Sequence, residues 1–135
     1  MDLHKLSLSK QLEGLKKGDF TSTELTSHYL NRISELDGQL NSFITVTEDQ
    51  ALSQAKAADD RYNTNNNFPL DGLPIAHKDI FCTKGVLTTC GSKMLSNFEA
   101  PYSSTVYDKL DKNGMVMLGK TNMDEFAMGS SNETS

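Results

Sequence analysis

Lys78 is the side chain whose surroundings most readily suggest chemistry. It follows the apolar residues 74–76 and precedes the apolar pair at 80 and 81. A lysine held in such surroundings is desolvated, which favours the neutral amine, and a neutral amine can take a proton from a nearby hydroxyl group. The alternation of side chains along a strand leaves a second interpretation open, in which Lys78 points to solvent and pairs with a neighbour such as Asp79.

A second candidate is the run Gly129-Ser130-Ser131-Asn132. A glycine followed by hydroxyl residues could offer backbone N–H groups to an oxyanion, as the sites of acyl-transfer enzymes do. An ordinary polar turn has the same composition. The residues alone leave both interpretations open.

The overall composition limits the classes of function. The chain carries 18 acidic and 13 basic residues, a formal net charge of −5, whereas binding to nucleic-acid phosphates needs clustered Lys and Arg. No apolar run approaches the ~20 residues that span a bilayer, and the first residues lack the apolar region of a signal peptide, so we expect a cytoplasmic protein. Cys82 and Cys90 are then expected as reduced thiols rather than a disulfide, and we expect no metal site because no second cysteine pair or histidine cluster accompanies them.

Residues 1–62 are predicted to be mostly helical. Leucines at helical spacing predict a first helix that ends at Gly18. Thr21 and Glu24 form a capping box, which predicts the start of a second helix, and Gly38 is expected to end it. The apolar stripes of these helices must face a partner layer.

The next segments predict a short strand and a third helix. Residues 43–46 form a β-type run, and Thr47 with Gln50 makes a second capping box. Alanines at helical spacing follow, and such small residues suit close packing. The polar, asparagine-rich residues 63–67 then mark a loop where the character of the chain changes.

The second half of the chain predicts the elements that hold the candidate residues. A strand-like segment runs from Leu73 through about Phe81, and residues 105–113 have helical spacing, with Gly114 as a left-handed cap. Residues 115–118 then form a compact buried strand. The order strand, helix, strand indicates an α/β fold with at least one parallel crossover.

Three segments resemble the amidase signature family. They are Leu-Pro-Ile-Ala-His-Lys-Asp at 73–79, Thr-Thr-Cys-Gly-Ser-Lys-Met-Leu at 88–95, and the run from 119 to 131, which is the most specific. The last run is similar to the branch of the family that releases ammonia from glutamine for tRNA-dependent amidation. The resemblance implies an N-terminal helical region at 1–62, followed at 63–135 by the start of the family's mixed-sheet α/β core. That core would be incomplete in this chain, which looks like the N-terminal part of a longer subunit.

The resemblance also implies roles for the candidate residues. The family uses a serine nucleophile, a bridging serine with a cis peptide bond, and a lysine, and Lys78 matches that lysine. Neutral Lys78 would draw a proton through the bridging serine and so activate the nucleophile. Both serines are expected beyond this chain, because the family's Gly-Gly-Ser-Ser-Gly-Gly-Ser segment does not occur in it. Met128, Gly129, Ser130 and Ser131 match the wall of the substrate pocket instead, so we expect the chain alone to have no glutaminase activity.

The partners implied by the resemblance are those of a heterotrimer. The ammonia would pass to a B subunit, which uses ATP and Mg²⁺ to activate the glutamate or aspartate of a misacylated tRNA, while a small C subunit clasps the other two. This chain itself would hold no cofactor and would contact neither membrane nor nucleic acid directly. The alternatives are a small-molecule amidase of the same family, or a non-catalytic module that docks partners through residues 1–62.

Overall fold

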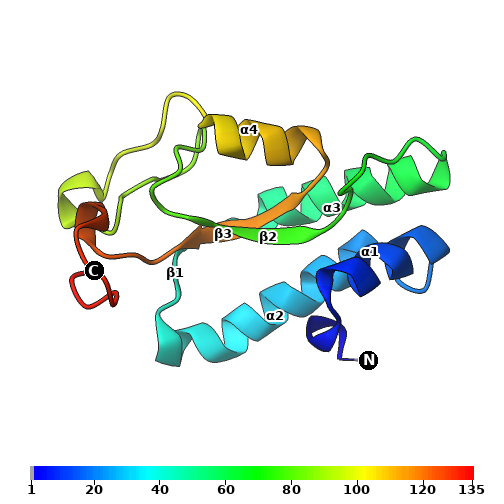
Figure 1. Cartoon of the computed structure of the whole chain (residues 1–135), viewed down its shortest axis with the longest axis horizontal. Helices are drawn as coiled ribbons and strands as arrows, with labels where there is room; N and C mark the ends of the chain where they lie inside the picture. Colours follow the sequence, from blue (N-terminus) through cyan, green and yellow to red (C-terminus); the bar gives the residue numbers. More distant parts are fainter. Residues whose placement is uncertain (1) are drawn as a thin grey trace.

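A small mixed sheet forms the centre of the protein, and the computed structural model describes residues 2–135 of it. The strands are β1 (Phe43–Val46), β2 (Pro74–Lys78) and β3 (Val116–Thr121), in the order β1-β3-β2. The central strand β3 runs antiparallel to β1 and parallel to β2. Helix α4 (Thr105–Lys112) connects the two parallel strands, so the predicted crossover and the α/β fold are confirmed (Figure 1).

Helices cover both faces of this sheet. The remaining elements are the helices α1 (Leu8–Lys17), α2 (Ser22–Leu40) and α3 (Glu48–Asn63) and the 3-10 turns η1 (Leu3–Lys5), η2 (Lys93–Leu95) and η3 (Glu125–Ala127). Val116 and Leu118 of β3 pack against α2 and α3. Met117 points the other way and packs against Tyr107 of α4. Figure 1 shows the same arrangement, with α4 and α2 on opposite sides of the strands.

A second core cluster ties the first elements of the chain to the strands. Leu15 of α1 and Leu25 of α2 are buried in one cluster with Leu73, which precedes β2, and Met115, which precedes β3. Because β1 also pairs with β3, residues from both halves of the chain contribute to the same sheet. The position of β2 therefore depends on packing from the N-terminal helices.

The first two helices begin and end for different reasons. Gly18 ends α1 with a φ of +75°, and the capping box of Thr21 and Glu24 opens α2, as predicted. The prediction that Gly38 ends α2 is wrong, because the helix continues to Leu40 and Asn41 takes the left-handed conformation with a φ of 52°. Asp37 stabilises this later end, since its carboxylate accepts a hydrogen bond from the Ser42 N–H at 2.7 Å.

Tertiary contacts override two other local predictions. The capping box of Thr47 and Gln50 does not form, because the Thr47 hydroxyl donates to the Met117 carbonyl at 3.0 Å and the Gln50 amide donates to the Tyr107 hydroxyl at 3.1 Å. Strand β2 ends at Lys78 rather than near Phe81. The Phe81 N–H donates to the Lys78 carbonyl at 3.1 Å and closes a turn there.

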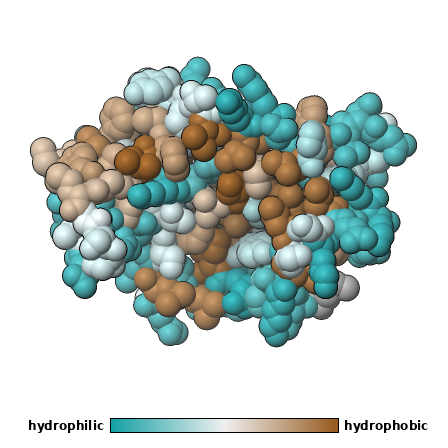
Figure 2. Space-filling model, in the orientation of Figure 1, coloured by the Kyte–Doolittle hydropathy of each residue, from teal (hydrophilic) through white to brown (hydrophobic). Residues whose placement is uncertain are grey.

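Several large apolar side chains remain on the surface. Met94 is 80% exposed, Met128 78% and Leu40 66%. Figure 2 shows apolar patches in the middle of the face that Figure 1 presents, with hydrophilic side chains gathered on its right-hand side. Among residues 2–135, none of the helices combines the length and the apolar character needed to cross a bilayer. Cys82 and Cys90 are half-buried free thiols.

Candidate functional site

Strand β2 presents Lys78 to solvent. The neighbouring His77 is buried and its ring lies 5.2 Å from that of Tyr107, and Asp79 is also buried. Side chains on a strand alternate between its faces, so Lys78 between these two is exposed. Of the two interpretations that the sequence left open, the exposed Lys78 matches the one in which it points to solvent rather than the desolvated one. Its suggested pairing with Asp79 is wrong, because the Asp79 carboxylate faces Lys120.

A surface hollow of about 490 Å³ lies beside Lys78. Its other lining residues come from the segment after β3, namely Asn122, Met123, Asp124, Ala127, Gly129, Ser130, Ser131 and Asn132. The structure thus brings Lys78 together with Gly129, Ser130 and Ser131. It does not bring Met128 into the lining, because that side chain projects into solvent.

The loop that carries Gly129 to Ser131 is held by Asp124. The Asp124 carboxylate accepts hydrogen bonds from the N–H and the hydroxyl of Thr134, each at 3.2 Å. The backbone N–H of Asn132, with those of Thr134 and Ser131, holds the pKa of Asp124 below its usual range. Gly129 packs so closely against Asp124 that a β-carbon there would overlap its carboxylate. Nothing in the sequence singles out Asp124, which lies five residues before Gly129 and directly before another acid, Glu125.

The buried lysine of this region is Lys120 on β3. Its side chain has no exposed surface, and its Nζ donates to the Phe81 carbonyl at 2.6 Å and to the Thr88 hydroxyl at 3.1 Å. The Asp79 carboxylate lies 3.4 Å away. Burial lowers the pKa of Lys120, and the negative charge of Asp79 opposes that shift. The sequence signal for this burial is that Lys120 continues the apolar strand at 115–118 without a turn.

The segments around the hollow contain left-handed backbone at residues that rarely adopt it. Cys90 and Phe126 each have a φ of 52°, and Ala127 has a φ of 59°. Such conformations cost of order 1–3 kcal/mol each and persist where the surroundings hold them in place. They are held by a direct link, because the Phe126 N–H donates to the Cys90 carbonyl at 2.9 Å.

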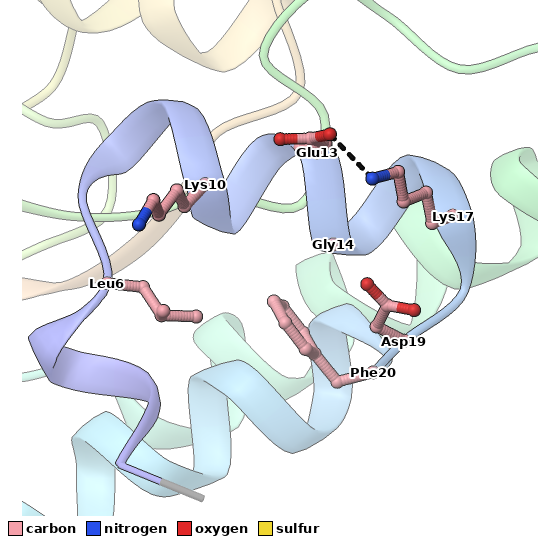
Figure 3. A pocket seen from close by; sticks show the side chains of 7 residues that line it. All are labelled: Leu6, Lys10, Glu13, Gly14, Lys17, Asp19 and Phe20. Atoms are coloured by element: carbon pink, nitrogen blue, oxygen red, sulfur yellow. Dashed lines mark hydrogen bonds and ion pairs between the residues drawn. The ribbon is translucent and has the colours of Figure 1, made fainter.

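A second hollow, of about 440 Å³, lies between η1 and α1 and the start of α2, away from Lys78 (Figure 3). The ring of Phe20 points into it beneath Gly14, and Glu13 and Lys17 at its rim neutralise each other at 2.6 Å. Its lining contains no Ser, Thr or Cys side chain that could act as a nucleophile. Within residues 2–135, no group of three or more His, Cys, Asp or Glu side chains is placed to hold a metal ion.

Comparisons with known proteins identify the family of this chain. The Amidase family model matches residues 24–135. The A subunit of the glutamyl-tRNA(Gln) amidotransferase of Alcanivorax borkumensis is 62% identical over 138 residues, which cover 98% of this chain and 28% of that protein. The corresponding protein of Thioalkalivibrio sulfidiphilus is 61% identical over 133 residues, with the same coverage of both chains. The chain therefore spans about 28% of the length of these curated relatives.

A solved structure shares the fold. The crystal structure of the A subunit of the glutamyl-tRNA(Gln) amidotransferase from Thermotoga maritima superimposes with a TM-score of 0.78 and 34% identity, over 100% of this chain and 26% of that chain. The shared region contains β2, the crossover helix α4 and β3, which together place Lys78. On the family match and this shared fold, the chain belongs to the amidase signature family.

Proposed function

We propose that this chain is the N-terminal part of the glutamine-amidase subunit of a tRNA-dependent amidotransferase, in which it supplies the catalytic lysine, Lys78. One observation carries the proposal: Lys78 lines the same hollow as Gly129, Ser130 and Ser131. A proton-accepting amine beside a wall of small and hydroxyl residues suits a site for a small polar amide. The identity of 62% to the A subunit of a glutamyl-tRNA(Gln) amidotransferase supports this substrate over other amides.

The mechanism that we propose uses Lys78 as the final proton acceptor of a relay. A serine hydroxyl from the remainder of the longer protein attacks the side-chain amide carbon of glutamine, and its proton passes through a bridging serine to the Lys78 amine. Backbone N–H groups hold the oxyanion. The C–N bond then breaks, the nitrogen takes the proton back and leaves as ammonia, and water releases glutamate from the acyl-enzyme. Lys78 must be neutral to accept the proton, and cover by the rest of the longer protein would favour that form.

The remaining parts of the proposal concern the complex. Ammonia passes to a B subunit that uses ATP and Mg²⁺ to activate the glutamate or aspartate on a misacylated tRNA, and a C subunit completes a cytoplasmic heterotrimer. The names of the similar proteins support this, since each is the A subunit of a glutamyl-tRNA(Gln) amidotransferase. The Gly129–Ser131 wall would then contact the glutamine.

Ammonia release from glutamine by the full-length subunit in its complex tests the proposal. Replacing Lys78 by alanine should lower kcat about 10²- to 10⁴-fold, the usual contribution of a positioned acid–base group. Lys84→Ala, at an exposed lysine six residues further on, is the matched control and should leave kcat unchanged. Full activity in Lys78→Ala would contradict the proposal. The 135-residue chain alone should release no ammonia, because it lacks the Gly-Gly-Ser-Ser-Gly-Gly-Ser segment in which the family carries its serines.

A second candidate function is hydrolysis of small amides without partner subunits. The peptide amidase from Stenotrophomonas maltophilia favours it, because that structure superimposes with a TM-score of 0.87 and 30% identity over 96% of this chain and 27% of that chain. Turnover of simple amides by the full-length subunit in the absence of B and C would select this candidate. Turnover of glutamine that depends on the complex would select the first.

A further inference from the structure

Lys120 stabilises the turn that begins at Lys78. The Phe81 N–H donates to the Lys78 carbonyl at 3.1 Å, and the Phe81 carbonyl in turn accepts a hydrogen bond from Lys120 Nζ at 2.6 Å. The same Nζ reaches the Thr88 hydroxyl and the Asp79 carboxylate. A buried charge is costly unless it is paired and hydrogen-bonded, so these contacts hold whenever the site is folded.

Asp79 extends these contacts toward the wall of the hollow that lies opposite Lys78. Its Oδ2 accepts from the Thr89 N–H at 2.9 Å and from the Thr89 hydroxyl at 2.5 Å, and its carbonyl accepts from the Cys90 N–H at 3.2 Å. The Cys90 carbonyl accepts from the Phe126 N–H, and Phe126 lies between the lining residues Asp124 and Ala127. These hydrogen bonds, together with the ion pair between Lys120 and Asp79, therefore join the buried pair to both sides of the hollow.

Two further contacts tighten the same junction. Gly91 has a φ of +67° and packs so closely on the Met123 carbonyl that an added β-carbon would lie 2.5 Å from its oxygen. The Ser92 hydroxyl donates to the Glu125 carboxylate at 2.6 Å. The left-handed conformations of Cys90, Phe126 and Ala127 require such support from their surroundings.

We propose that Lys120 and Asp79 are positioning residues of the candidate site, which fix the backbone at Lys78 relative to the loop that carries Gly129 to Ser131. The inference rests on the proposed function of that site. Neither residue lines the hollow, so both act through Lys78 and the loop. Misplacement of a reacting group by about 1 Å can cost about 10²-fold in rate, so loss of the pair should lower turnover without removing a reacting group.

The test replaces both buried charges together in the full-length subunit within its complex. Lys120→Met/Asp79→Asn leaves no unpaired charge behind, whereas either single replacement would. We expect a melting temperature close to that of the wild type, a kcat for ammonia release about 10- to 100-fold lower, and a KM within about three-fold of the wild type. The matched control is Lys17→Met/Glu13→Gln at an exposed ion pair of 2.6 Å, and it should change none of the three.

A purely structural role for the pair predicts a different outcome. A double variant that melts like the wild type and keeps its kcat would overturn the proposal. If the double variant does not fold, Asp79→Glu replaces it, because it keeps the charge and shifts the carboxylate by one methylene group. We expect at least about a ten-fold loss of kcat in Asp79→Glu, and an unchanged kcat there would also overturn the proposal.

Hydrogen exchange on the same full-length variants separates this inference from the proposed function. Exchange at the amides of Phe81 and Phe126 should rise about ten-fold or more when the pair is removed, while amides in α2 keep their rates. The exchange measurement does not depend on ammonia release. A wild-type complex that releases no ammonia would contradict the proposed function alone, whereas unchanged exchange at both amides would overturn the positioning role.

Discussion

The hollow around Lys78 and the buried cluster around Lys120 lie at the same end of the sheet, but one lysine side chain is exposed and the other is buried. Lys78 pairs in register with Thr121, and His77 pairs with Lys120, so the two lysines sit one register step apart on adjacent parallel strands. Lys120 has no exposed surface and contacts a carboxylate, a carbonyl and a hydroxyl group. Lys78 is exposed beside a hollow.

The comparison shows that burial of a lysine and its availability for chemistry are separate properties. Lys120 is buried in the way that the apolar surroundings of Lys78 suggested for Lys78. Its amine is already engaged in polar contacts within the protein. Lys78 lies exposed beside the hollow, where it is free to meet a substrate. In this fold the buried lysine serves the backbone, and we assign the exposed one to the reaction.

The largest expected effect contrasts the two lysines directly. Lys120→Met leaves the Asp79 carboxylate buried without its partner, so it should lower the free energy of unfolding by about 3–5 kcal/mol. Lys78→Met changes an exposed position and should stay within about 0.5 kcal/mol of the wild type. Denaturant unfolding of both variants measures the difference. Equal losses of unfolding free energy in the two variants would contradict the difference between the two lysine environments.

A methyl group at Gly91 should disturb its close contact with Met123, which lines the hollow. Left-handed backbone costs about 1–2 kcal/mol for a residue with a side chain, and overlap with the Met123 carbonyl adds to that cost. We therefore expect Gly91→Ala to destabilise the chain by more than about 1 kcal/mol. Gly38→Ala, inside α2 where the added carbon meets open space, should instead be neutral or stabilising. Thermal unfolding of the two variants decides, and a neutral Gly91→Ala would show that this junction is loose.

Asp124→Asn should release the loop beside Lys78 and leave the Lys120 cluster intact. Its amide removes the negative charge that accepts the N–H groups of Asn132 and Thr134. Exchange at these two amides should rise about ten-fold or more, while Thr89 keeps its rate. Asp60→Asn, at an exposed aspartate of α3, is the control. Faster exchange at Thr89 as well would mean that the two regions do not open independently.

The smallest effect concerns His77, which lies beside Lys78 but faces the buried side. Burial, with the nearby Lys120 charge, lowers the pKa of His77 below its ordinary value of 6.5. The unfolded chain therefore takes up this proton first, so stability should fall as the pH drops below 6.5, by less than about 1.4 kcal/mol per pH unit. His77→Phe should remove this part of the slope between pH 7 and 5. An equally steep fall in the variant would place His77 in contact with solvent.

Local signals predicted the elements well where one short motif decides the outcome. The capping box of Thr21 and Glu24 opens α2, and the order strand, helix, strand produces the parallel crossover through α4. The predictions failed where distant residues compete for the same groups. The Thr47 side chain serves the Met117 carbonyl instead of its own helix, and Asp37 stabilises the end of α2 beyond Gly38.

The sequence motifs named several residues that share the hollow but not its geometry, and Met128, which they also named, lies outside the lining. The motifs named Lys78 and the Gly129–Ser131 run, and the fold brings these to one hollow. Their surroundings depend on a shift in the pairing of β2 with β3 between Ile75 and Ala76. Such a shift changes which side chains face the core, and no pattern in the sequence reveals it. The roles of Asp79 and Lys120 follow from that register.

Competitive acetylation of the folded chain, read out by mass spectrometry at each lysine, tests the contrast between Lys78 and Lys120 most directly. Lys78 should react as fast as the exposed Lys84 and Lys112, and Lys120 should react about 10²-fold or more slowly, until denaturant makes all four equal. Reaction of Lys120 at the rate of Lys84, or protection of Lys78 in the native chain, would contradict the assignment of one lysine to the interior and the other to the reaction.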